Sequence, residues 1–268
     1  MKPWIKIALW SAFGIAVIAL LLMVEQAQDE IPTERPEIEV HVKGEAHFIT
    51  EEEILEDLAF HKLWKKGMRA GDLPVDKIEA YLKGISQVKE ARVYRKLGGD
   101  WKIEVTTRMP IARIFNSQGQ TYYLDDEGFT MEISELHAAR VLVVTGDIPD
   151  VLAGETYAEI INNDSLKSIR MLDDIYRISN YVCKDPLFHS LIGQIHLEKN
   201  GDFVLTPLVG DQRIVFGSAP SEKEVEEKFK KLEIFYKEAM PYEGWDAYTE
   251  ISLKYEDQIV CKKKETDG

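Results

Sequence analysis

The chain has 268 residues, a formal net charge of −14 at pH 7 and two cysteines. An acidic balance of this size repels nucleic acid, and two cysteines are too few for a disulfide framework. We therefore exclude a nucleic-acid-binding protein and a disulfide-stapled miniprotein, and the length allows two small domains.

An uncharged apolar run opens the chain. Residues 7–24 contain no charged side chain, and Lys2 and Lys6 precede them. A bilayer core about 30 Å thick needs roughly 20 apolar residues in a helix. The sequence therefore predicts a transmembrane helix over residues 5–24, with the lysine-bearing N-terminus, residues 1–4, in the cytoplasm.

A cleaved signal peptide is the alternative reading of this segment. Its apolar region would be about 7–15 residues long and would end in small residues. Here the run is longer and ends in Leu22, Met23, Val24 and Glu25, which are not the small residues of a signal-peptide cleavage site. We therefore expect an uncleaved anchor with everything after it outside the cytoplasm. That remainder carries 31 basic and 47 acidic side chains once the two lysines before the run are removed, a net charge of −16.

Residues 25–36 are predicted to be a linker, because they are polar, contain two prolines and show no periodicity. The next segment, 37–108, has the pattern of one compact unit. It begins with alternating apolar residues typical of a strand, continues with two helices that start at the capping box of Thr50 and near Pro74, and ends in two strands around the glycine turn at Gly98. The predicted order is βααββ.

Residues 109–261 are predicted to form a second unit rich in strands, followed by a tail over 262–268. Strand patterns occupy 111–115, 120–124, 141–144, 192–197, 203–208, 213–216 and 248–256. One helix is expected after Asp164 or Ser165, and another from the capping box at Ser221 to Ala239. The predicted class is α+β: a transmembrane helix, a βααββ unit, and a mixed β-sheet with flanking helices. We expect Cys183 and Cys261 to be free, mostly buried thiols.

Motifs that carry catalysis or bind metal are weak or missing. The six histidines form no H-E-x-x-H pair, and the chain has no C-x-x-C and no G-x-S-x-G. Ser86 and Lys89 match S-x-x-K, the nucleophile motif of penicillin-binding enzymes, but Ser86 follows a helix end and the companion motifs are missing. The acidic run from Asp125 to Gly128 lacks the spacing of a calcium loop. We therefore predict no catalytic residue, cofactor, metal or small-molecule substrate.

Three short stretches, in this order along the chain, resemble the bacterial division family FtsQ/DivIB. Met109-Pro110-Ile111-Ala112 resembles the start of that family's β domain, followed by the turn of Tyr123–Gly128. Val215-Phe216-Gly217 before the Ser221 helix resembles its late strand and helix, and Ile251–Tyr255 resembles its terminal strand. The 37–108 unit is similar to a POTRA domain. Ser252 and Lys254 depart from the family's usual Asp and Arg.

The resemblance implies a non-enzymatic scaffold of the division complex in the inner membrane. It would be a single-pass protein with its bulk in the periplasm, enriched at the septum, and would help to control septal wall synthesis. The implied partners are small single-span coiled-coil proteins, FtsB/DivIC-like and FtsL-like. The only other implied partner is the lipid bilayer around the transmembrane helix.

The partner site is predicted on the last strand pattern and the helix from Ser221 to Ala239. An edge strand has unpaired N–H and C=O groups, to which a partner segment can add as a further strand. The predicted partner-binding residues are Tyr248, Thr249, Glu250, Ile251, Ser252, Leu253, Lys254 and Tyr255. Tyr255 could instead be a core residue.

Two other functions remain open at this point. An anchored envelope enzyme acting on cell wall or peptides would need a cleft of titratable groups near Ser86 or His189. A POTRA-containing envelope assembly factor would usually repeat the module and add a membrane barrel, and the sequence contains neither a repeat nor such a segment.

Overall fold

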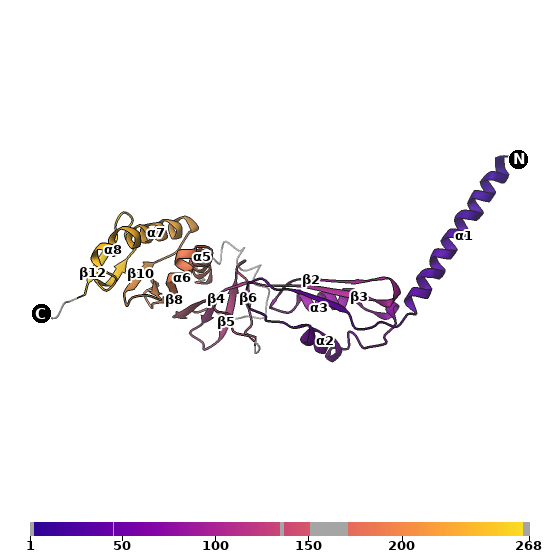
Figure 1. Cartoon of the computed structure of the whole chain (residues 1–268), viewed down its shortest axis with the longest axis horizontal. Helices are drawn as coiled ribbons and strands as arrows, with labels where there is room; N and C mark the ends of the chain where they lie inside the picture. Colours follow the sequence, from indigo (N-terminus) through magenta and orange to yellow (C-terminus); the bar gives the residue numbers. More distant parts are fainter. Residues whose placement is uncertain (1–2, 45, 135–136, 151–170, 265–268) are drawn as a thin grey trace. The chain divides into compact units, whose positions relative to one another are not determined.

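The computed structural model describes residues 3–44, 46–134, 137–150 and 171–264. The chain divides into two compact units, Met1–Lys43 with His47–Thr107, and Gly44–Ala46 with Arg108–Gly268. The described elements follow the predicted α+β order (Figure 1).

Helix α1, Pro3–Asp29, opens the first unit. Within it, Trp10–Asp29 is long and apolar enough to cross a membrane, a test that a signal sequence also passes. Most of its described large apolar side chains, such as Phe13 and Leu21, are more than half exposed because no other part of the described chain packs on them. An exposed apolar surface of this kind fits a lipid environment.

A three-stranded sheet forms the body of the first unit. Its strands are β1 (Glu37–His41), β2 (Val88–Arg95) and β3 (Trp101–Thr107), in the order β1-β3-β2. β1 runs parallel to the central β3, and β2 runs antiparallel to it. Helices α2 (Glu51–Phe60) and α3 (Val75–Lys83) and the short helical turns η1 (Ala70–Asp72) and η2 (Leu97–Gly99) complete the unit.

Local sequence signals explain where these elements begin. Thr50 caps α2: its Oγ1 accepts from the N–H of Glu53, whose carboxylate accepts from the N–H of Thr50. Pro74 precedes α3, and Gly84 ends it. The apolar faces then meet in a core in which Leu58, Leu82 and Ile103 are fully buried.

The segment predicted as a linker is ordered against the first unit. α1 continues beyond the apolar run to Asp29, because polar residues can also form a helix. Two main-chain hydrogen bonds then join Thr33 to the facing loop. The N–H of Thr33 donates to Met68 O, and the N–H of Gly67 donates to Thr33 O. Trp64 Nε1 donates to Thr33 Oγ1 (3.1 Å), and Trp101 Nε1 donates to Glu34 O (2.9 Å). Residues 33–34 of the predicted linker are therefore bonded to the first unit.

The second unit is built on one mixed sheet of the order β12-β11-β10-β9-β8-β7-β4-β5-β6. β4 and β7, β7 and β8, and β10 and β11 pair in parallel, and the remaining neighbours are antiparallel. The strands are β4 (Pro110–Phe115), β5 (Thr121–Asp125), β6 (Thr130–Met131), β7 (Leu142–Gly146), β8 (Ile192–Leu197), β9 (Phe203–Pro207), β10 (Arg213–Gly217), β11 (Tyr248–Ser252) and β12 (Val260–Lys263).

Helices pack on this sheet around an aromatic core. Phe229 stacks on Tyr181 with ring centroids 4.5 Å apart and contacts Phe188 (4.7 Å) and Phe216 (5.1 Å). The core therefore joins three helices to β10. The helices of this unit are α5 (Leu172–Lys184), α6 (Pro186–Leu191), α7 (Glu222–Ile234), the π-helical turn η3 (Phe235–Ala239) and α8 (Met240–Glu243).

The short elements that were not predicted include α6 and β12. Asp185 caps α6 by accepting from the N–H groups of Leu187 and Phe188, and Pro186 occupies its first turn. β12 begins at Val260, so Lys262 and Lys263 belong to a strand and not to a tail. The predicted start of a helix at Asp164 or Ser165 lies outside the described residues.

Candidate partner-binding site

The predicted terminal strand is not an edge strand, which corrects our expectation. β11 ends at Ser252 and lies between β10 and β12. The N–H of Leu253 donates to Val215 O (2.8 Å), and Ser252 lies opposite Val260. After a turn, the chain runs back antiparallel to β11 as β12. The sequence pattern did not predict this strand, because four residues are too few to show alternation. A partner cannot add to β11 while β12 is in place.

Three of the eight predicted residues serve the fold. Ile251 and Leu253 are fully buried in the core of the second unit, and Ser252 is 8% exposed. Their burial follows from the position of β11 between β10 and β12.

The other five predicted residues reach the surface to different degrees. Thr249 and Lys254 are exposed, and the Lys254 Nζ lies 2.6 Å from an Asp202 oxygen. Tyr255 is 51% exposed, which overturns the alternative of a core residue. Tyr248 and Glu250 are half-buried, and Tyr248 lies under the Lys263 ammonium.

One edge of this sheet is the far side of β12, and the two-residue strand β6 forms the other. Thr249 Oγ1 donates to Lys262 O (3.2 Å), and Lys264 N–H donates to Ala247 O (2.9 Å), so the main-chain groups of these lysines face β11. Main-chain groups of successive strand residues point to opposite sides. The N–H and C=O of Cys261 and Lys263 therefore face outward, where no strand of the described chain pairs with them.

Exposed aromatic and aliphatic side chains occur in β12 and in the α8 segment that is joined to it by an ion pair. α8 is tied to β12 by the Lys263 ammonium, 2.9 Å from Glu243, and the two elements lie together in Figure 1. Tyr242 is 89% exposed, and Trp245 is 44% exposed and stacks on Tyr236. Val260 is 42% exposed. Together with β12, these side chains form the candidate partner surface, and the sequence analysis named none of them. The aromatic residues that precede β11 are the feature of the sequence from which this surface could have been predicted.

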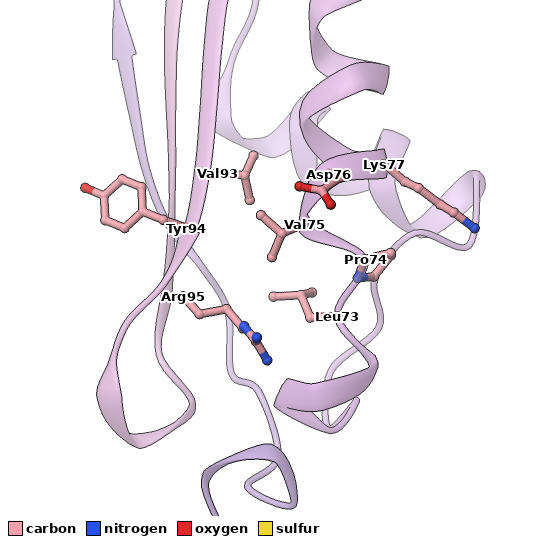
Figure 2. Close-up of a pocket in the computed structure, with 8 residues that line it drawn as sticks. All are labelled: Leu73, Pro74, Val75, Asp76, Lys77, Val93, Tyr94 and Arg95. Atoms are coloured by element: carbon pink, nitrogen blue, oxygen red, sulfur yellow. The ribbon is translucent and has the colours of Figure 1, made fainter. Parts of the chain in front are cut away.

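An open groove lies in the first unit between the edge strand β2 and helix α3. Its volume is about 630 Å³, with Leu73, Val75 and Val93 pointing into it and Tyr94 pointing away (Figure 2). Glu79 covers part of the neighbouring strand edge, since its carboxylate accepts from Val93 N–H (3.1 Å). The Lys83 ammonium, 2.6 Å away, and this N–H lower the pKa of Glu79. The outward N–H of Val93 is therefore already used, unlike the outer edge of β12.

The weak chemical motifs take structural positions. Ser86 lies in a turn after α3, and Lys89 lies in β2, so the motif does not open a helix as a penicillin-binding nucleophile must. Asp125 folds the acidic turn by accepting from the N–H groups of Glu127 (2.9 Å) and Phe129 (2.6 Å). Within the described ranges no three His, Cys, Asp or Glu side chains are placed to hold a metal.

Both cysteines are free thiols, as expected, but each is only partly buried where mostly buried thiols were predicted. Burial raises the pKa of Cys183 and of Cys261. A raised thiol pKa disfavours the thiolate, which is the reactive form.

Comparison with known families covers both units. A family model described as FtsQ/DivIB, C-terminal related, matches residues 109–262, and a model of a POTRA-like domain matches residues 34–106. Neither is a family of enzymes, and no match was found among curated proteins. The first match covers more than half of the 268 residues, and the two follow the order predicted from the sequence. The chain therefore belongs to the FtsQ/DivIB family of bacterial cell division proteins.

Proposed function

We propose that this chain is a non-enzymatic, membrane-anchored scaffold of the bacterial division complex. It binds small single-span partners of the FtsB/DivIC and FtsL types and helps to control septal wall synthesis. Family membership supports the division role. The observation that carries the binding role is the outer edge of β12, which is flanked by exposed aromatic residues.

The proposed location is the inner membrane, with enrichment at the septum. The N-terminus lies in the cytoplasm and the two units lie in the periplasm. The lysines before the apolar run and the acidic residues after it support this orientation, because positive charge is retained on the cytoplasmic side.

The proposed binding mode is addition of a partner strand to β12. Its main-chain groups would bond to the outward N–H and C=O of Cys261 and Lys263. Main-chain bonds provide affinity in this mode, and side-chain pockets provide specificity. Tyr242 and Trp245 are suited to the second role, since exposed aromatic residues are common anchors in interfaces. Of the residues predicted from the sequence, Thr249, Lys254 and Tyr255 remain candidates for contacts at the rim.

A proline at position 261 tests this mode. Cys261→Pro removes one outward N–H, while the bonds that β12 makes to β11 come from its neighbours. We expect pull-down of the FtsB/DivIC-like partner to fall by about tenfold or more. Cys261→Val, which keeps the N–H, is the matched control and should bind as wild type does. A folded Cys261→Pro chain with wild-type binding would contradict strand addition.

The cellular role has its own test. Depletion of the protein in the bacterium that encodes it should give undivided filaments. Normal division after complete depletion would contradict the scaffold role, whatever the binding mode.

A further inference from the structure

The tip of the hairpin between β2 and β3 is fixed to the end of helix α1. Gly98 N–H donates to the side chain of Gln28 (3.1 Å), and the Arg95 guanidinium binds Asp29 (3.0 Å). Gly99 has a φ of +86°, and a Cβ there would lie 2.6 Å from the Ile31 side chain. Only glycine permits this close approach, so the hairpin is held against the residues that follow the apolar run.

This attachment sets the height of the hairpin relative to the apolar run. Gln28 lies four residues after Val24, the last apolar residue of the run. At 1.5 Å per residue, this is about 6 Å along the helix. The headgroup layer on each side of a bilayer is about 5–7 Å thick. If α1 spans the membrane, the hairpin tip therefore lies at the level of the lipid headgroups.

The side chains at this level suit a membrane surface. Leu97, at the tip, is 83% exposed. Lys65 and Lys66 are exposed on the loop that bonds to the segment after α1, through Gly67 N–H to Thr33 O (3.0 Å). Single exposed leucines are common, so the position of Leu97 matters more than its exposure.

Two of the nearby acidic groups, Asp29 and Glu30, are paired with arginines, whereas Glu25 and Asp100 form no ion pair within the described residues. Asp29 binds Arg95, and Glu30 lies 3.4 Å from Arg69. The ammonium groups of Lys65 and Lys66 make no ion pair within the described chain, which leaves them available to lipid phosphates.

We propose that the β2–β3 hairpin tip, led by Leu97, inserts into the headgroup layer of the membrane that α1 crosses, with Lys65 and Lys66 beside the phosphates. The inference rests on the proposed membrane span of α1. It gives the first unit a second attachment to the bilayer, so that the unit lies on the membrane surface.

The test uses the full chain in vesicles of phosphatidylethanolamine and phosphatidylglycerol in equal amounts, with Cys183 and Cys261 replaced by alanine. A fluorophore is attached at Leu97→Cys, and its quenching by lipids with a nitroxide on the headgroup is measured. The matched control is Glu90→Cys, an exposed position on β2, the strand that leads to the tip. Glu90 lies roughly 17 Å from Arg95 along β2 at 3.3 Å per residue.

We expect quenching at position 97 to exceed that at position 90 by at least about twofold, because only the tip would reach the headgroup layer. A third label, at Ile18→Cys, reports the span through lipids with a nitroxide on the acyl chain. Quenching at 18 with equal, weak quenching at 97 and 90 would overturn the hairpin contact alone. No quenching at 18 would overturn the span and the hairpin contact together.

Discussion

Single residues show how far a local pattern predicts a role. Alternation from Tyr248 to Tyr255 predicted one partner-binding strand, yet Ile251 and Leu253 are fully buried. The pattern also extended too far, because β11 ends at Ser252 and the alternation of faces ends with the strand. Asp125 was predicted only as part of an acidic turn, yet it is fully buried and bound to Arg108 (2.8 Å). Burial of that carboxylate depends on a partner 17 residues earlier in the chain, which no local pattern contains.

Replacing Asp125 should destabilise the second unit strongly. Asp125→Ala leaves the Arg108 guanidinium, a largely buried charge, and two turn N–H groups without their acceptor. Removing one partner of a buried ion pair costs about 3–5 kcal/mol. The midpoint of urea unfolding, followed for this unit, measures the loss.

The control is Asp211→Ala, in the exposed turn between β9 and β10. It should change the free energy of unfolding by less than about 0.5 kcal/mol. Equal stability of the two variants would show that the Arg108–Asp125 pair is not a structural requirement.

At the scale of elements, long amphipathic segments were predictable and short capped ones were not. The βααββ order followed from alternation, a capping box and glycine turns, and each signal spans several residues. α6 and β12 contain six and four residues, too few for a period to show. The error at the candidate site arose because β12 was not predicted. Without β12, β11 was expected to be the edge strand, and part of β12 was assigned to a C-terminal tail.

The core of the first unit provides a test at this scale. Ile103 lies in the central strand β3 and is fully buried between β1 and β2. Ile103→Ala should cost about 2–5 kcal/mol, because it removes buried methyl groups and leaves a cavity.

Arg92→Ala, on the exposed side of β2, is the matched surface variant and should cost less than about 0.5 kcal/mol. Thermal unfolding of both variants provides the comparison. A melting temperature for Ile103→Ala equal to that of Arg92→Ala would mean that β3 does not carry the core.

At the scale of the whole molecule, an apolar helix precedes two folded units that contain no assembled catalytic group among the described residues. A membrane-spanning helix was predictable from the apolar run, because the length of the run can be compared with the thickness of a bilayer. The attachment of residues 28–36 to the first unit was not, since the contacts of Thr33 and Glu34 depend on Trp64 and Trp101, far along the chain. The molecule thus has an apolar helix, the proposed anchor, near one end of its sequence and an open strand edge near the other.

The orientation of the anchor can be tested directly. A periplasm-dependent phosphatase fused to the C-terminus should be active, and the mature protein should begin at or near Met1, because lysines precede the span and acidic residues follow it. Fusion assays and N-terminal sequencing measure both. A mature N-terminus near residue 28 would mean a cleaved signal peptide instead.

The central claim is that β12 offers its outer edge to a partner strand. Residue-resolved hydrogen exchange on the full chain, with and without the FtsB/DivIC-like partner, tests it most directly. The account predicts that the partner slows exchange of the Cys261 and Lys263 amides, which face outward. The Lys264 amide, already bonded to Ala247, should change little. Unchanged exchange at Cys261 and Lys263 in the bound complex would contradict the account.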